Sequence, residues 1–301
     1  MSEVIQGTSL WTDAWRRWRR HKVSVASAVV ILVVMLFCFL GPIVVGATWG
    51  WTYEAQDIAL GPSAPSFAHP FGTDVLGRDV MVRTMHGGRV SLLIAFVATA
   101  VSLFVGVTWG ATAGYAGGRV DAVMMRIVDL MLSTPYLLLV IVLMAVIPPS
   151  SLSFAGMDGS FVMMFAALGL VSWLILARIV RGQVLSRKER EFVEAARAIG
   201  VPPHLILFRH IVPNTLGPVI VYSTLTIPGV MLSEAFLSFL GLGIREPQAS
   251  WGTLVNDGAN AMVVYPWLLI GPGALMTLTL FCLNFLGDGL RDALDPSQRK
   301  G

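Results

Sequence analysis

The longest charged stretch of the sequence, residues 187–200, lies between two segments that are apolar enough to cross a membrane. Its residues are mostly strong helix formers, and Glu194 precedes Arg197 at helical spacing, which predicts a short helix. Gly200 is suited to end this helix in the left-handed conformation, and Pro203, with the proline before it, prevents the helix from continuing. We interpret the stretch as the place where the membrane-embedded part is pushed by something outside it.

A second short helix is predicted from Pro203 to His210, because proline is tolerated in the first turn of a helix. Its four central residues are all apolar: Leu205, Ile206, Leu207 and Phe208. This is more apolar surface than a short loop helix bathed in water would carry, and Pro213 is expected to end the helix. An ordinary connecting loop with a snorkelling basic edge remains an alternative interpretation.

The residue types needed for catalysis are present, but not in catalytic arrangements. No lysine stands in a Gly-Lys-[Ser/Thr] motif, so the chain is not expected to bind ATP through a phosphate-binding loop. None of the five histidines lies deep in an apolar segment: His21, His69, His86, His204 and His210. No His-Glu-x-x-His motif is present, which argues against a membrane-embedded hydrolase. We therefore expect no catalytic residue and no cofactor on this chain.

Charged residues also gather in the stretch before the second apolar segment. Asp74, Arg78 and Asp79 have only one histidine nearby and lack the spacing of metal ligands, so no metal site is expected. A folded turn is the favoured interpretation, held by Asp–Arg pairs and by Gly72 and Gly77.

Glu234 is the acidic residue that stands out within the apolar sequence, late in the fifth predicted span. An acid at membrane depth is by default a functional candidate, here for the pore or the substrate. The alternative is that Glu234 lies at the outer interface and caps a helix or binds water.

The composition indicates the class of protein. Of its 301 residues, 55% are hydrophobic and only 13% are charged, which is typical of an all-α polytopic membrane protein. The net charge of +3 comes mostly from arginines beside the predicted spans, so it reports topology and predicts no nucleic-acid partner. Cys38 and Cys282 lie in apolar segments and are interpreted as small hydrophobic residues.

Six transmembrane helices are predicted. Their approximate ranges are 23–46, 90–114, 122–147, 161–181, 215–240 and 267–287. Of the 21 lysines and arginines, 17 fall in the N-terminal segment, the second and fourth connections with the span ends beside them, and the C-terminal tail. The positive-inside rule therefore predicts that both termini and the charged stretch are cytoplasmic.

The N-terminal segment combines tryptophans with arginines. Trp11, Trp15 and Trp18 recur at i, i+4 and i+7, which is one face of a helix. We expect an interfacial helix on the inner leaflet, and the basic flank of the first span is a compatible interpretation.

Glycines, a pair of opposite charges and prolines within the predicted spans indicate how these helices pack and bend. Three glycines share one helix face and predict close packing against another span: Gly106, Gly110 and Gly114. Arg126 and Asp129 are three residues apart and predict a local ion pair. Pro135 and Pro228 permit kinks.

The charged stretch resembles the EAA loop of ABC-importer permeases. The resemblance rests on Glu194-Ala195-Ala196, then three residues and Gly200, with Pro213 thirteen positions after the glycine. The last four residues, 210–213, read His-Ile-Val-Pro where the pattern has Ile-x-Leu-Pro, so the first of them departs from it. The resemblance implies a coupling helix that docks on an ATPase subunit. The residues that it assigns to coupling are Glu194, Ala195, Ala196, Gly200, Pro203 and Pro213.

Further stretches resemble the C-type permease subunits of bacterial oligopeptide and dipeptide importers: 69–80, 236–243 with Trp251-Gly252, and 284–296. This resemblance implies a type I ABC-importer permease fold over 89–290, preceded by an N-terminal region 1–88 and followed by a cytoplasmic tail 291–301. It implies a related B-type permease, two ATPase subunits that bind ATP and Mg²⁺, and a periplasmic peptide-binding protein as partners. The expected location is the bacterial inner membrane.

A proton-coupled secondary transporter is the competing hypothesis. It would require ionisable residues near the middle of the membrane and usually two repeated halves. Asp129 and Glu234 are the candidates, both are expected near span ends, and no clear repeat is present.

Overall fold

The computed structural model describes residues 10–146 and 159–294, and every regular element in these ranges is a helix. In chain order the helices are α1 (Leu10–Arg20), α2 (Lys22–Trp49), α3 (Val80–Ala116), α4 (Gly118–Ser133), α5 (Tyr136–Val146), α6 (Gly159–Arg187), α7 (Glu191–Ala198), α8 (Pro203–Leu205), a π-helical segment η2 (Ile206–Ile211), α9 (Val212–Phe239), α10 (Trp251–Ala261) and α11 (Trp267–Leu294). The predicted all-α class is confirmed.

Five helical segments are long and apolar enough to cross a membrane: α2, α3, α6, the run Pro203–Phe239 and α11. A sixth arises if α4 and α5 count as one span, which is bent by 92°. The predicted six spans are therefore reached if this bent pair counts as the third span. The chain is a multi-pass membrane protein.

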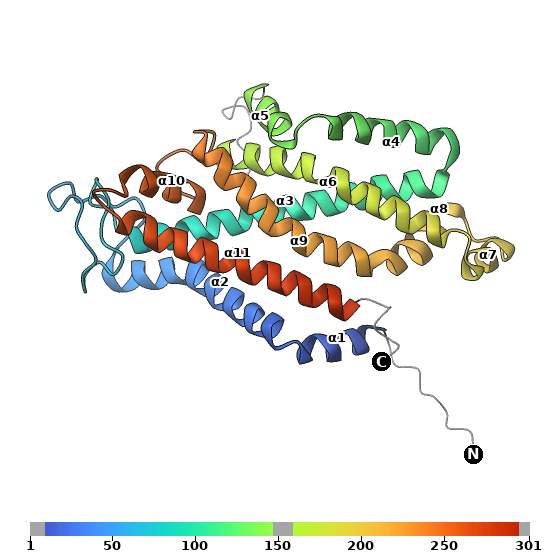
Figure 1. The fold of residues 1–301 in the computed structure, drawn as a ribbon, viewed down its shortest axis with the longest axis horizontal. Helices are drawn as coiled ribbons and strands as arrows, with labels where there is room; N and C mark the ends of the chain where they lie inside the picture. Colours follow the sequence, from blue (N-terminus) through green and yellow to red (C-terminus); the bar gives the residue numbers. More distant parts are fainter. Residues whose placement is uncertain (1–9, 147–158, 295–301) are drawn as a thin grey trace, which may run out of the picture.

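Figure 1 shows the long helices side by side along one axis, with α2 and α11 on one side of the bundle and α4 on the other. Residues 50–79 and α10 lie at one end, here called the α10 end. The opposite end, called the α7 end, carries α1, α7, α8 and the last turn of α11. The α10 end is therefore built from a long connection and the short helix α10, whereas the α7 end is built from short helices and the end of a long one.

The glycine stripe of α3 lets this helix approach α6 at backbone distance. A Cβ added at Gly110 would lie 2.3 Å from the carbonyl oxygen of Ala177, and one at Gly114 would lie 2.9 Å from the carbonyl oxygen of Arg181. Lipid tails are as apolar as side chains, so such close packing is a main source of helix association in membranes. The predicted packing role of the stripe is confirmed.

The bend between α4 and α5 occurs at Pro135. Thr134 before it adopts an extended conformation, with φ −89° and ψ 135°, because the proline ring disfavours a helical residue at this position. The predicted kink at Pro135 is confirmed, and Pro228 lies inside α9.

Several helix boundaries and one loop differ from the prediction. Helix α3 begins at Val80 instead of 90, because Asp79 caps it and its polar first turns continue the helix. Helix α11 continues to Leu294. The connection after α9, predicted as an ordered loop, contains helix α10, whose N-terminus is capped by Ser250. Cys38 and Cys282 are buried free thiols.

Candidate functional site

The charged stretch forms α7, which projects beyond the other helices at its end of the bundle (Figure 1). Glu191 and Glu194 lie in its first turn and Arg197 in its last turn. This distribution of charge matches the helix dipole, which favours acids at the N-terminus and bases at the C-terminus. The predicted short helix is confirmed.

The end of α7 is closed by a glycine turn. Gly200 has φ +80°, and its N–H donates to the carbonyl of Arg197 at 3.0 Å. The next N–H, of Val201, donates to the carbonyl of Ala196 at 3.0 Å. These two bonds form a Schellman motif, which needs a residue in the left-handed conformation at the position of Gly200. The turn fixes the direction in which the chain leaves α7.

The chain after Gly200 is one continuous helical run from Pro203 to Phe239. The prediction that Pro213 ends a separate helix is wrong. Proline would clash with the carbonyl four residues earlier in a regular α-helix. Here the wider π-helical segment η2 precedes it, the N–H of Val212 bonds to the carbonyl of Leu207, and Pro213 falls in the first turn of α9.

The inner face of this region is packed on the membrane-crossing helices. Five of its side chains are buried: Val193, Ala196, Ile206, Leu207 and Ile211. They form one apolar cluster with Ala111 of α3, Leu176, Val180 and Val184 of α6, and Val219 of α9. The buried face of α7 and η2 therefore belongs to the same closely packed apolar cluster as residues of α3, α6 and α9.

The outer face carries most of the residues assigned to coupling. Glu194, Ala195, Gly200, Pro203 and Pro213 are exposed, whereas Ala196 is buried against the chain itself. Ala195 therefore faces outward from α7, whereas Ala196 packs inward against the rest of the chain.

Four exposed apolar side chains accompany these residues and were not singled out from the sequence as a docking surface: Phe192, Ile199, Leu205 and Phe208. Ile199 is 80% exposed. Their spacing was the available signal, because Phe192 and Ile199 are seven residues apart, and Leu205 and Phe208 are three apart. These four side chains are candidates for a docking surface on this end of the protein.

Helix α6, which leads into α7, is tied to α4 by two ion pairs. Arg181 binds Asp121 through two bonds of 2.5 and 2.6 Å, and Arg178 binds Asp129 at 2.5 Å. The predicted local pair of Asp129 with Arg126 is wrong, because the carboxylate of Asp129 turns to a neighbouring helix. A fork-like guanidinium contact of this kind holds two helices in a defined register.

The α10 end is organised by a turn before α3. Asp74 accepts hydrogen bonds from the backbone N–H of Leu76 and Arg78, each at 2.9 Å, and from the Arg78 side chain at 2.6 Å. Gly77 has φ +71°, and a Cβ there would lie 1.9 Å from the carbonyl oxygen of Asp57. Gly72 also has a positive φ. The predicted turn with its Asp–Arg pair and glycines is confirmed.

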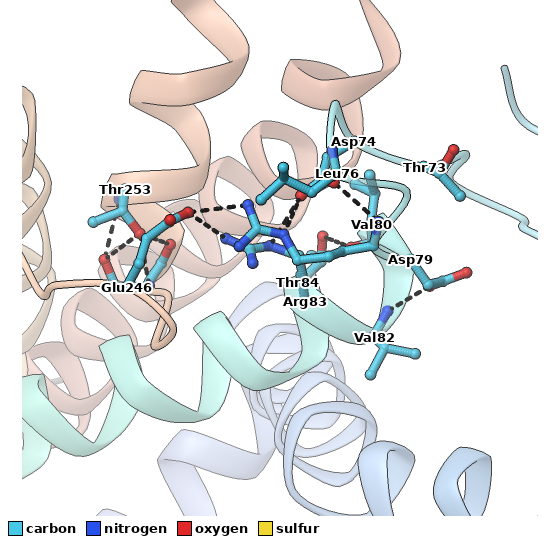
Figure 2. A network of polar contacts seen from close by, with 12 residues as sticks. Thr73, Asp74, Leu76, Asp79, Val80, Val82, Arg83, Thr84, Glu246 and Thr253 are labelled. Carbon is cyan, nitrogen blue, oxygen red and sulfur yellow. Dashed lines mark hydrogen bonds and ion pairs between the residues drawn. The ribbon is translucent and has the colours of Figure 1, made fainter. Parts of the chain in front are cut away.

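This turn is clamped to the connection between α9 and α10, as Figure 2 shows for Asp74, Arg83 and Glu246. Arg78 donates to Glu246 at 3.0 Å. Arg83 is buried and lies 3.7 Å from Asp74 and 3.9 Å from Glu246. Burial lowers the pKa of Arg78, but its bonds to Asp74 and Glu246 outweigh burial and raise that pKa overall.

Glu234 lies within the same end and is 1% exposed. Its carboxylate accepts hydrogen bonds from Ser91 at 3.1 Å, Ser238 at 2.9 Å and Ser250 at 2.6 Å. These serines belong to α3, to α9 and to the cap of α10. Glu234 therefore joins three elements, and its role in a pore stays a prediction.

Metal-binding groups are not assembled at either end. Among residues 10–146 and 159–294, no group of three or more His, Cys, Asp or Glu side chains could hold a metal ion. The arrangement combines two features. The connections at the α10 end are held together by ion pairs, and the α7 end has an exposed surface whose inner side packs on the core.

Comparisons with known proteins agree with this arrangement. Residues 106–300 match the model of the family "binding-protein-dependent transport system inner membrane component". Residues 9–65 match the N-terminal transmembrane domain of oligopeptide transport permease C. The first of these matches covers more than half of the chain.

The chain is similar to curated proteins over nearly its whole length. The oligopeptide transport system permease protein OppC of Escherichia coli (strain K12) is 48% identical over 297 residues, which are 98% of this chain and 94% of that protein. The protein of the same name from Haemophilus influenzae is 46% identical over 299 residues, with 98% and 91% covered. The dipeptide transport system permease protein DppC of Bacillus subtilis is 40% identical over 289 residues, with 96% and 86% covered.

A solved structure has a similar fold. A chain of the MetNI methionine ABC transporter, in an inward-facing conformation, superposes with a TM-score of 0.55 at 17% sequence identity. The match covers 72% of this chain and 96% of that chain. At this identity the likeness shows the fold alone.

Proposed function

The chain belongs to the family of binding-protein-dependent transport system inner membrane components, and we propose that it couples ATP hydrolysis to peptide import through α7 and η2. It is the permease subunit of an ABC importer, without ATPase activity of its own. Its relatives are named for oligopeptide and dipeptide transport, which supports oligopeptides or dipeptides as the substrate class. The structural observation that supports the coupling role is the exposed outer face of α7 on a packed inner face.

The proposed partners follow from what this chain lacks and what its family requires. The sequence has no phosphate-binding loop, so ATP and Mg²⁺ are held by two partner ATPase subunits. A related B-type permease completes the pore, and a periplasmic binding protein delivers the peptide. The 17 basic residues of the predicted inner segments support an inner-membrane location with the α7 end in the cytoplasm.

The proposed mechanism uses the packing of α7. Closure of the ATPase dimer around ATP displaces α7, whose exit direction is fixed by the Gly200 turn. Val193 and Ala196 carry the displacement into the cluster with α3 and α6, and the run Pro203–Phe239 carries it along the span. The spans then rock between inward- and outward-facing states, and hydrolysis resets them.

Purification of the chain from its native membrane in mild detergent tests the proposal. We expect a second permease and two ATPases to co-purify, with ATP hydrolysis stimulated by a peptide-loaded binding protein. A chain without ATPase partners, whose peptide uptake persists without any ATPase and stops with an uncoupler, would instead indicate a secondary transporter.

A further inference from the structure

Helix α1 meets α2 at a fixed elbow. His21 between them is not helical, with φ −82° and ψ 85°, and its ring Nδ1 accepts the N–H of Ser24 at 3.2 Å. The indole N–H of Trp18 donates to the Ser24 hydroxyl at 2.8 Å. These two bonds hold α1 at an angle to the first span, as Figure 1 shows.

The elbow also contacts α11. A Cβ added at Gly289 would lie 2.3 Å from the Cβ of Ser24, so the start of α2 and the end of α11 approach at backbone distance. Ala14 of α1 is buried, whereas Trp15, next to it on the apolar side of the helix, is 57% exposed. The ring of Trp15 lies 4.9 Å from that of Trp18. The apolar side of α1 is thus only partly covered by the protein.

The polar side of α1 is basic, and most of it is exposed. Four side chains at or next to α1 are exposed: Arg16, Arg19, Arg20 and Lys22. None of them takes part in an ion pair among the residues that the structure describes. Asp13 is the acidic residue of the helix, so the positive charge is in large excess.

The position of this charge indicates its ligand. The first span is uncharged from Val23 onward, so α1 lies at the level where the hydrocarbon of a bilayer gives way to headgroups. Tryptophan prefers this level, and a guanidinium binds phosphate oxygens in a fork-like geometry. Four or more basic residues immediately beside a span are typical of sites for anionic lipids.

We propose that Arg16, Arg19, Arg20 and Lys22 form a binding surface for the phosphate headgroups of anionic phospholipids. The bound headgroup neutralises this surface while Trp15 enters the interface, and the elbow then holds α2 and α11 in a fixed relation. This role concerns the lipid surroundings of the protein and is separate from its proposed coupling to ATPases.

Native mass spectrometry of the purified protein tests the proposal. The bound lipids are first exchanged either for phosphatidylcholine alone or for phosphatidylcholine with added phosphatidylglycerol. We expect phosphatidylglycerol to remain bound to the wild type. Replacing Arg16, Arg19 and Arg20 together by Gln should lower its affinity on the order of a hundredfold, at roughly fivefold per basic residue. The matched control replaces the same three residues by Lys, keeps the charge, and should retain most of the binding.

A salt titration of the wild type keeps the proposal testable if the Gln variant is not inserted. Phosphatidylglycerol binding should fall as salt rises, because salt screens exposed charges. Unchanged binding in the Gln variant, or binding by the wild type that is insensitive to salt, would overturn the proposal. Loss of a partner protein from the Gln variant in both lipid compositions, without a change in bound lipid, would show that the basic side contacts protein and would also overturn it.

Discussion

The two ends of the bundle hold their charges in opposite ways. At the α10 end, Arg78 and Asp74 are nearly buried and bind each other, and Glu234 is enclosed by three serine hydroxyls. At the α7 end, the charged side chains of Glu194 and Arg197 are exposed. A buried network of hydrogen-bonded charges resists change, whereas an exposed surface on a packed inner face can receive a partner. This contrast supports the proposal that the α10 end serves stability and the α7 end serves movement.

Replacing Arg78 by Met should give the largest loss of stability. The change leaves the carboxylates of Asp74 and Glu246 without their main cation, and breaking a buried pair costs about 3–5 kcal/mol. Thermal unfolding of the purified protein in detergent measures the loss. The matched control is Arg178→Gln, which opens an ion pair whose side chains are each 49% exposed and should cost about 1 kcal/mol or less. Equal losses in the two variants would contradict the described difference between the buried network and an exposed ion pair.

Replacing Glu234 by Gln should cost less. The amide offers one acceptor oxygen to hydroxyls that now meet a carboxylate, and partly unsatisfied buried hydroxyls cost about 1–3 kcal/mol. The same unfolding assay measures it, with the exposed Glu54→Gln as control. If instead the stability is unchanged while peptide uptake is lost, Glu234 acts in the pore and does not stabilise the α10 end.

Replacing Gly200 by Leu should have a small effect on stability and a large effect on uptake. A side chain at φ +80° costs roughly 1–2 kcal/mol, and no atom lies within 4 Å of the position to clash with it. The altered turn misdirects the chain between α7 and α9, so we expect peptide uptake to be abolished while the protein still reaches the membrane. Gly182→Leu, at a helical position with open space, is the control. Normal uptake by the Gly200 variant would rule out the coupling role of the turn.

Replacing Phe208 by Ser should have the smallest effect on stability, about 0.5 kcal/mol or less, because the side chain is 50% exposed. We nevertheless expect weaker association with ATPase subunits, measured by co-purification. Ile206→Ser serves as a contrast, because Ile206 is buried and its loss should unfold the region. Full association of the Phe208 variant would remove this residue from the docking surface.

Features set by neighbouring residues were predictable from the sequence. The helix at 191–198, its glycine turn and the turn at Asp74 depend on local propensity, capping and left-handed glycines. The packing role of the glycine stripe of α3 was also predictable, because the helical spacing alone places the three glycines on one face.

Features set by distant residues were not predictable. Asp129 pairs with Arg178, 49 residues away, and Arg78 pairs with Glu246, 168 residues away. Pro213 was predicted as a helix end because the rule for proline assumes a regular α-helix, and only the π-helical segment before it removes the clash. The spacing of Phe192 and Ile199 was a signal in the sequence, but only the packing of Val193 and Ala196 shows which side of α7 is exposed.

Site-specific cross-linking from position 199 tests the coupling role most directly. Ile199 is 80% exposed at the tip of α7, and both native cysteines are buried, so a single introduced cysteine can carry a photoreactive probe. In the assembled, ATP-hydrolysing complex we expect cross-links from position 199 to an ATPase subunit. A probe at Phe67, fully exposed at the α10 end, should give none to that subunit. Hydrolysis without any cross-link from position 199 to an ATPase, or with the same cross-link from position 67, would contradict the account.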